Sequence, residues 1–342
     1  CHRRSEFELV LEAAVDELIG TPVDALVFGL GDGRTVLHGT KVGELWGSPV
    51  KKWPHLIFRR AHQNAKMMLE SGKDPLRIVC DHAQGSGMLI YPSLLLNRGR
   101  GEKQEHDVRA AKFTWENKHL EIGASGDLPS NFTGLRKLDF KHKEVRDERF
   151  SIIEEVLNNY PVDGFELLFS HMHFFHPQEL EVGRKIMTAW VKRVYEAVKA
   201  SGKERELAVL VPADIETAFS LGLDLKEWIH EGIVDVINAQ SYYQKVDNLA
   251  NFRPLVEAAK DTSCRIHASI NGVINSDRVA GAPIEMIRAV ASNYWSQGID
   301  GLLLAQWFAG TNWPYQASFY EQLREVSYPK LMAPKDKFYL VP

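Results

Sequence analysis

The feature that most constrains the fold is a short pattern that occurs four times along the chain. In each copy a small residue or a proline ends one element, an aspartate follows, and a β-rich apolar run comes next. The four copies lie at residues 20–28, 161–169, 232–239 and 298–305. Continuous apolar strands that follow amphipathic helices are typical of a parallel sheet buried on both faces. The repeat therefore predicts an α/β protein in which strands and helices alternate.

The segments that read as strands number seven, and each is short, apolar and rich in β-branched or aromatic residues. They are residues 24–30, 88–96, 162–169, 207–211, 234–239, 265–270 and 301–306. The intervening helices carry apolar stripes at helical spacing, as in the run from Ile186 to Val198. The first clear element, residues 5–19, is a helix that precedes the first of these strands.

A closed barrel explains this rhythm better than a doubly wound nucleotide-binding sheet. The nearest glycine-rich stretch, residues 29–33, lacks the last glycine of the dinucleotide-binding sequence and opens no helix. We therefore expect a (β/α)8 TIM barrel that lacks or replaces its first strand. Because no linker divides the chain, we expect a single domain over residues 1–342 with long βα loops.

Composition excludes several classes of protein. The 342 residues carry 41 Lys and Arg against 45 Asp and Glu, a net charge of −4, so no basic surplus favours nucleic-acid binding. No apolar run reaches the ~18–20 residues that span a bilayer, so we expect no membrane span. Three cysteines imply no disulfide framework, and Cys80 and Cys264 read as core thiols. Neither the compartment nor the oligomeric state follows from these features.

Two neighbouring motifs point to a family. Residues 138–146 read Leu-Asp-Phe-Lys-His-Lys-Glu-Val-Arg, and residues 162–169 read Val-Asp-Gly-Phe-Glu-Leu-Leu-Phe. They resemble the "LD…PEVR" segment and the following "DG-I/L-E/H-L/F-D" strand of glycoside-hydrolase-like (β/α)8 barrel proteins. Further similarity covers residues 31–47, 74–79, 106–110, 222–228 and 293–298. The resemblance implies a barrel that acts on a carbohydrate, with the "LD" segment in a loop after a strand.

The chain departs from this family at one pair of positions. The family strand reads Glu-Leu-Asp, whereas this chain reads Glu166-Leu167-Leu168, and related chains carry an arginine where this one has Leu95. The resemblance thus implies that an Arg–Asp pair has been replaced by two leucines. Losing both partners together avoids leaving one buried charge unpaired, which costs about 3–5 kcal/mol.

Glu166 is the first candidate for a catalytic residue. Active sites of such barrels lie at the carboxyl ends of the strands. Strand alternation places Glu166 on one face with Leu168 and Ser170, among large apolar residues whose burial raises a carboxyl pKa, as a general acid requires. The alternative is a buried glutamate that is paired with a neighbouring cation.

A glycosidase also needs a second carboxylate. Asp214, after the strand at 207–211, and Asp32, after the strand at 24–30, are the two candidates. Asp214 is equally well placed to cap a helix that begins at Ile215. The repeated aspartates before the strands lie at the opposite end of the barrel, and we expect them to be structural.

Polar and aromatic residues at strand ends supply the side chains that sugars require. The candidates for substrate binding are His38, Asn97, His171, His173, Gln240, Tyr242, Asn271, Gln306 and Trp307. The run His171, His173 and His176 also permits loop packing or a zinc site, but it matches no fixed metal-binding spacing. We expect neither a metal nor another cofactor.

Two functions remain open from the sequence. The first is a glycoside hydrolase in which Glu166 is the general acid/base and Asp214 or Asp32 its partner. The second is a catalytically silent carbohydrate-binding barrel, motivated by Leu95 and Leu168. Metal-dependent hydrolysis through the histidines is the least favoured alternative.

Overall fold

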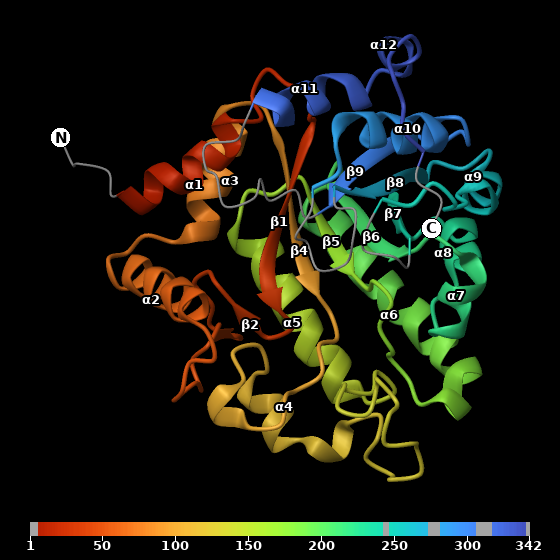
Figure 1. Cartoon of the computed structure of the whole chain (residues 1–342). Coiled ribbons are helices and arrows are strands. Elements are labelled where there is room, and N and C mark those ends of the chain that lie inside the picture. The colour runs from red at the N-terminus through yellow and green to blue at the C-terminus, as the bar shows by residue number, and fades with distance from the viewer. Residues whose placement is uncertain (1–5, 242–245, 273–280, 306–316, 340–342) are drawn as a thin grey trace. The chain divides into compact units, whose positions relative to one another are not determined.

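The computed structural model describes residues 6–241, 246–272, 281–305 and 317–339. Helices and strands alternate along most of the chain (Figure 1). The helices are α1 (Glu6–Asp16), α2 (Leu56–Glu70), α3 (Pro75–Gly85), α4 (Lys112–Glu116), α5 (Lys143–Asn159), α6 (Leu180–Ser201), α7 (Ile215–Ser220), α8 (Leu225–His230), α9 (Arg253–Ala259), α10 (Ile284–Trp295), α11 (Ala317–Val326) and α12 (Pro329–Met332). The strands are β1 (Ala25–Asp32), β2 (Thr35–Val36), β3 (Glu44–Leu45), β4 (Leu89–Leu95), β5 (Gly164–Leu168), β6 (Glu206–Pro212), β7 (Val236–Gln240), β8 (Arg265–Asn271) and β9 (Gly301–Ala305).

The predicted α/β class is confirmed. Each of the seven predicted strands corresponds to one long strand, namely β1, β4, β5, β6, β7, β8 and β9. The helix predicted at 5–19 is α1. The two-residue strands β2 and β3 were missed, because such short segments carry no periodic signal.

The chain divides into two compact units. The first comprises Cys1–Ile19, Asp24–Leu207 and Ser220–Leu223; the second comprises Gly20–Val23, Ala208–Phe219 and Asp224–Pro342. Within the first unit the strand order is β3-β2-β1-β4-β5, with β1, β4 and β5 parallel and β2 antiparallel to β1. Within the second unit β6, β7, β8 and β9 follow one another as parallel neighbours.

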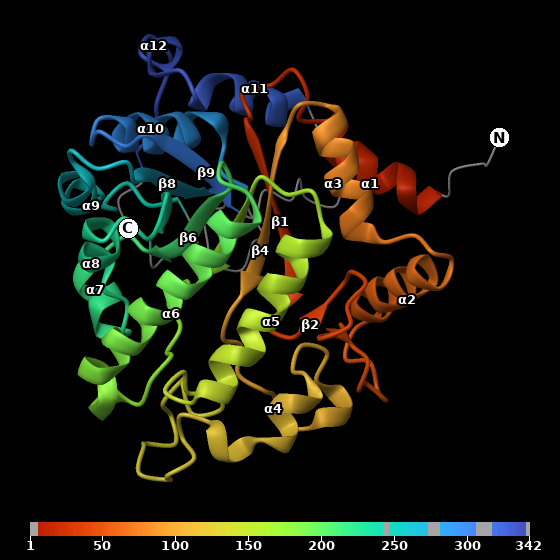
Figure 2. The ribbon, with the colours of Figure 1, turned by 180° about the vertical axis from the view of Figure 1, so that it is seen from behind.

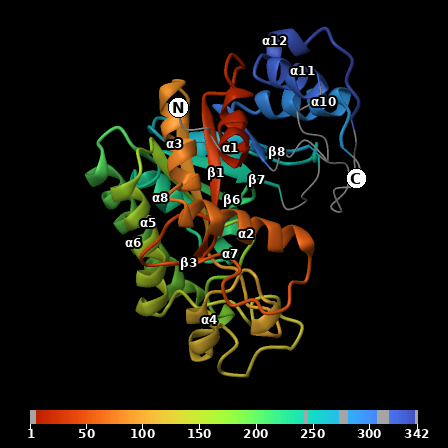
Figure 3. The ribbon, with the colours of Figure 1, turned by 90° about the vertical axis from the view of Figure 1, so that its left-hand side faces the viewer.

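Helices cover one face of the strands in the first unit. Helix α3 contacts both β4 and α1, and Figure 3 shows α1 beside α3. Figure 2 shows α5 on the near side of the strands. The side chains of Leu94, Phe165 and Leu167 are fully buried, as expected for strand residues that face packed helices. The segment that contains α4 lies beyond the carboxyl ends of β1 and β4 (Figures 1 and 2).

Two aspartates of the repeated pattern, one in each unit, have a common structural role. In the first unit the Ile90 backbone N–H donates to Asp163 Oδ2 at 2.9 Å. In the second unit the Ile266 N–H donates to Asp300 Oδ2 at 2.8 Å. Each carboxylate therefore binds an amide near the start of the neighbouring strand. This role accounts for two of the four aspartates that precede the apolar runs, Asp163 and Asp300.

The motif at residues 138–146 is a loop that leads into the first turn of α5, and its own side chains close it. Asp139 Oδ1 accepts a hydrogen bond from the Lys141 N–H at 2.9 Å. The Arg146 guanidinium, from the first turn of α5, donates to the carbonyls of Phe140 and Lys141. The "LD" part of the motif, Leu138 and Asp139, lies in the loop between β4 and α5, as predicted, and the charged residues of the motif hold the entry to α5.

Candidate functional site

Glu166 is held on β5 by a hydroxyl group from the neighbouring strand. Glu166 is 1% exposed, and Ser93 Oγ on β4 donates to its Oε1 at 2.6 Å. The Cα atoms of Ser93 and Glu166 are direct partners in the parallel register. The carboxyl group is therefore fixed on two rigid strands instead of on a loop.

Two leucines occupy the next row toward the carboxyl ends of these strands. Leu95 and Leu168 are register partners, two residues beyond Ser93 and Glu166 respectively. Because strand side chains alternate, all four side chains lie on the same face. The two positions at which the sequence departs from the resembled family are thus direct neighbours on β4 and β5.

Asp32 lies at the end of β1 in the same row as these leucines. Its Cα atom pairs with that of Leu95, so Asp32, Leu95 and Leu168 are in register across three strands. Between Gly29 and Gly31 the register shifts by one residue. Such a bulge reorients the residues that follow it, and bulges are frequent beside active sites.

The environment of the Asp32 carboxyl group is mixed. Its side chain is 11% exposed, and Oδ2 accepts a hydrogen bond from the Trp46 indole N–H at 3.2 Å. The Arg109 Nε lies 3.6 Å from the same oxygen. Burial raises the pKa of Asp32, while Arg109 and the indole N–H oppose that increase. A carboxyl group with a raised pKa is suited to proton transfer.

Asn97 connects the loops that follow β4 and β5. Its buried Nδ2 donates to the carbonyls of Leu138 and His173, at 2.8 and 2.9 Å, and the Leu138 N–H donates to its Oδ1 at 3.2 Å. The amide group is therefore occupied by backbone contacts. Its role in this structure is to hold the loops together.

The histidines after β5 differ in their surroundings. The His173 ring packs against Phe132 with 4.5 Å between centroids, and burial lowers the pKa of both His171 and His173. His176 Nδ1 accepts from the Gln178 N–H at 3.3 Å. Within the part of the chain that the structure describes, no group of three or more His, Cys, Asp or Glu residues is arranged to hold a metal ion.

His38 is 2% exposed and packs edge-on against Tyr160, with 5.6 Å between ring centroids. Tyr160 precedes β5, so this contact lies near the amino-terminal end of that strand, whereas Leu168 marks the carboxyl end. Neither ring nitrogen of His38 has a hydrogen-bond partner among the described residues. Burial accordingly lowers its pKa.

Asp214 belongs to the second unit, where it caps a helix. It is exposed, and its Oδ1 accepts from the Thr217 N–H at 2.7 Å at the start of α7. The structure therefore places Asp214 in the capping role that its position before Ile215 allows.

The other candidates in the second unit lie at strand ends or outside the described residues. Gln240, the last residue of β7, and Asn271, the last residue of β8, are both buried. The buried residues Asn238 and Ser269 precede them by two positions, so polar side chains follow the same face of each strand. Tyr242, Gln306 and Trp307 lie outside the residues that the structure describes.

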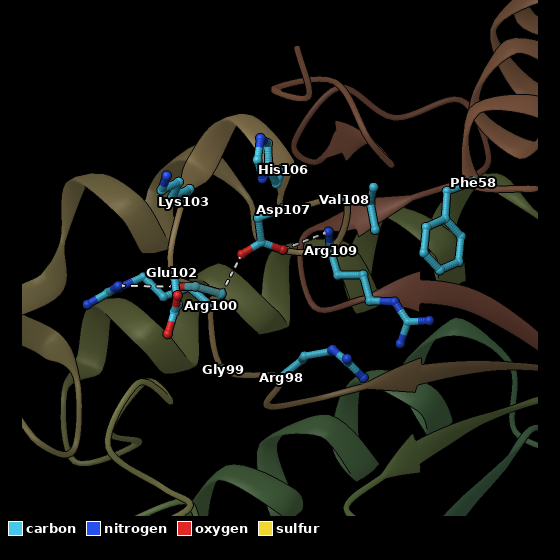
Figure 4. Close-up of a pocket in the computed structure, with 11 residues that line it drawn as sticks. Phe58, Arg98, Gly99, Arg100, Glu102, Lys103, His106, Asp107, Val108 and Arg109 are labelled. Carbon is cyan, nitrogen blue, oxygen red and sulfur yellow. Dashed lines mark hydrogen bonds between the residues drawn. The ribbon is translucent and has the colours of Figure 1, made fainter. Parts of the chain in front are cut away.

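The residues that sequence reasoning missed line a basic cavity after β4. This cavity has a volume of about 730 Å³ and lies between Phe58 and the loop at residues 98–109. Figure 4 shows Arg98 and Arg109 extending toward the same end of it. The Arg98-Gly-Arg100-Gly run is the sequence feature that indicates a cationic site. The nearly balanced overall charge of the chain hides this local concentration of cations.

Comparisons with known proteins support the fold. No protein-family model matches the chain, and no curated protein matches it. Solved structures do: α-L-fucosidase isoenzyme 2 from Paenibacillus thiaminolyticus has a TM-score of 0.55 at 12% identity, covering 96% of this chain and 46% of that one. The galactosidase domain of the α-galactosidase–sucrose kinase AgaSK has a TM-score of 0.53 at 13% identity, covering 96% and 38%.

The α-amylase of Geobacillus thermoleovorans is similar as well, with a TM-score of 0.52 at 12% identity and coverage of 96% and 73%. This chain thus spans less than half of the fucosidase and galactosidase chains. At such low identity the likeness shows the fold alone. The α/β architecture matches the TIM-barrel catalytic domains of glycoside hydrolases. In the described helices, no segment is both long enough and apolar enough to cross a membrane.

Proposed function

We propose that this protein is a glycoside hydrolase in which Glu166 is the general acid/base and Asp32 the second carboxylate. The observation that carries the proposal is the pair of carboxyl groups on strands of one compact unit. Ser93 holds Glu166, and Trp46 holds Asp32. Asp214 is a weaker partner because its carboxylate caps α7.

The chemistry follows from the requirements of glycoside cleavage. One carboxyl group protonates the leaving oxygen while the other activates water or attacks the sugar. As the second carboxylate Asp32 acts in its ionised form, which Arg109 and the Trp46 indole N–H favour by opposing the increase in pKa that burial causes. The likeness to glycoside hydrolase domains supports a carbohydrate as the substrate, although the finer assignment rests on these residues.

A second function is favoured by one observation. The Leu95–Leu168 pair lies in the row beyond Glu166, where the resembled family carries charged residues. An apolar row at that position suits a barrel that binds a carbohydrate without cleaving it. His171, His173, Gln240 and Asn271 are retained as proposed substrate contacts in either case.

The test is a screen of oligosaccharides and aryl glycosides with the wild type, Glu166→Gln, Asp32→Asn and Asp214→Asn. We expect Glu166→Gln and Asp32→Asn each to lower turnover by about 10²–10⁴-fold with substrate binding retained. Asp214→Asn is the matched control, because asparagine also caps helices, and it should keep full turnover. Binding without turnover by the wild type would instead establish the silent barrel.

A further inference from the structure

The loop that forms the basic cavity is organised by its own hydrogen bonds. Asp107 Oδ2 accepts from the Gly101 N–H at 2.7 Å, and its Oδ1 accepts from the N–H groups of Arg109 and Ala110 at 3.1 and 3.2 Å. The Arg109 carbonyl accepts from Thr35 Oγ1 at 2.9 Å, which ties the loop to the β1–β2 turn. These hydrogen bonds fix the conformation of the loop that lines the cavity in the first unit.

The acidic groups around the cavity are already engaged. Besides Asp107, Glu102 lies 3.9 Å from Arg136, and its side chain is 82% exposed. Glu121 binds Arg100 through both guanidinium nitrogens Nε and Nη2. Arg100 is thus neutralised, and the remaining cations of the lining decide what the cavity attracts.

Those cations are not fully neutralised by the protein. Among the described residues, no hydrogen bond or ion pair within 4.0 Å engages the guanidinium of Arg98 or the ammonium of Lys103. Arg109 forms an ion pair with one oxygen of Asp32, its Nε lying 3.6 Å from Oδ2. Lys137 lies behind the loop, with its Cγ 3.2 Å from the position of a Cβ on Gly99.

The proximity of these like charges affects their pKa values. Burial and Arg109 lower the pKa of Arg98 although Asp32 and Asp107 oppose the shift, and burial and Arg98 lower the pKa of Lys137 to about 8. Like charges that are held close and partly desolvated destabilise one another, and a bound anion relieves that repulsion. Guanidinium groups in particular match the planar geometry of carboxylate and the oxygens of sulfate or phosphate.

We propose that this cavity binds the anionic substituent (a carboxylate, sulfate or phosphate) of an acidic carbohydrate. Arg98 is the principal contact of the anionic group, and Arg109 orients that group. Because Arg109 also approaches Asp32, the anion lies next to the carboxyl group proposed for catalysis. This inference rests on the proposed function for the nature of the ligand. Phe58, over which Arg109 lies at 5.7 Å, supplies an apolar surface for a sugar ring.

The test is a glycan array that presents neutral oligosaccharides beside their uronate-, sulfate- and phosphate-bearing counterparts. We expect the full chain to prefer charged glycans, and Arg98→Gln to weaken that binding about tenfold or more, as the loss of charge-assisted hydrogen bonds predicts. Arg60→Gln is the matched control, since Arg60 is exposed on α2 and does not line the cavity. The class of anion that binds best identifies the substituent.

The proposal fails if only neutral glycans bind, if no charged glycan binds, or if Arg98→Gln and Arg60→Gln behave alike. These results are separable from those of the hydrolase test. Turnover of neutral glycans alone would overturn the anion site and keep the hydrolase. Binding of charged glycans without turnover would keep the anion site and overturn the hydrolase.

Discussion

Glu166 illustrates how one side chain can be placed by its immediate neighbours. Its partner Ser93 is the register partner on β4, and the row beyond both residues is leucine. A buried carboxyl group in such surroundings depends on the few polar contacts that it has, because water does not replace them.

Removing the Ser93 hydroxyl group should therefore be costly. We expect Ser93→Ala to lower the free energy of unfolding by about 1–3 kcal/mol, because the buried Glu166 Oε1 loses the hydrogen bond from Ser93. Ser269→Ala on β8 is the matched control, since the Ser269 hydroxyl is buried and has no hydrogen-bond partner in the described part of the chain. Urea unfolding of both variants measures the difference, and equal effects would show that the Ser93 bond adds nothing.

A buried histidine makes the stability depend on pH. Burial lowers the pKa of His38 from the ordinary 6.5, although Asp74 and Glu155 oppose the shift. The unfolded chain then binds more protons than the folded one below about pH 6.5, so the stability falls as the pH decreases through that range. His171 and His173 act in the same direction.

The variant His38→Phe isolates the contribution of His38. We expect the wild type to lose more of its free energy of unfolding between about pH 8 and about pH 5 than His38→Phe does. The other histidines contribute to both proteins, so they cancel in the comparison. Chemical unfolding at the two pH values supplies the measurement, and identical losses would contradict a neutral, buried His38.

At the scale of elements, the bulge in β1 positions Asp32. Gly31 has φ of +146°, and a Cβ placed on it would lie 2.1 Å from the Thr35 carbonyl oxygen. Only glycine fits there without displacing the β1–β2 turn. The same turn meets the basic loop through Thr35, so one glycine supports both Asp32 and the cavity beside it.

We expect Gly31→Ala to destabilise the protein by about 2 kcal/mol or more, because the backbone must move to accommodate the methyl group. Gly29→Ala on the same strand is the control, since no heavy atom lies within 4 Å of the position that a Cβ would take there. Its effect should stay within about 1 kcal/mol. Thermal or urea unfolding distinguishes the two variants, and comparable losses would show that the close approach at Gly31 is unimportant.

At the scale of the whole molecule, the strands and their alternation with helices could be predicted, because buried parallel strands leave continuous apolar runs. The resemblance suggests a link between Leu95 and Leu168, but only the structure shows that they are direct register partners. The capping role of Asp214 was foreseen as an alternative. The hydrogen bonds that occupy the Asn97 amide group and the basic cavity could not be predicted, since both depend on which loops meet in space.

The most direct test of the central claim is the rate at which the wild type and Glu166→Gln release sugar from a glycan that both bind. We predict equal affinity and a loss of about 10²–10⁴-fold in rate for the variant. A wild type that binds the glycan and releases nothing, or a variant as fast as the wild type, would contradict the assignment of Glu166 as the general acid/base of a glycoside hydrolase.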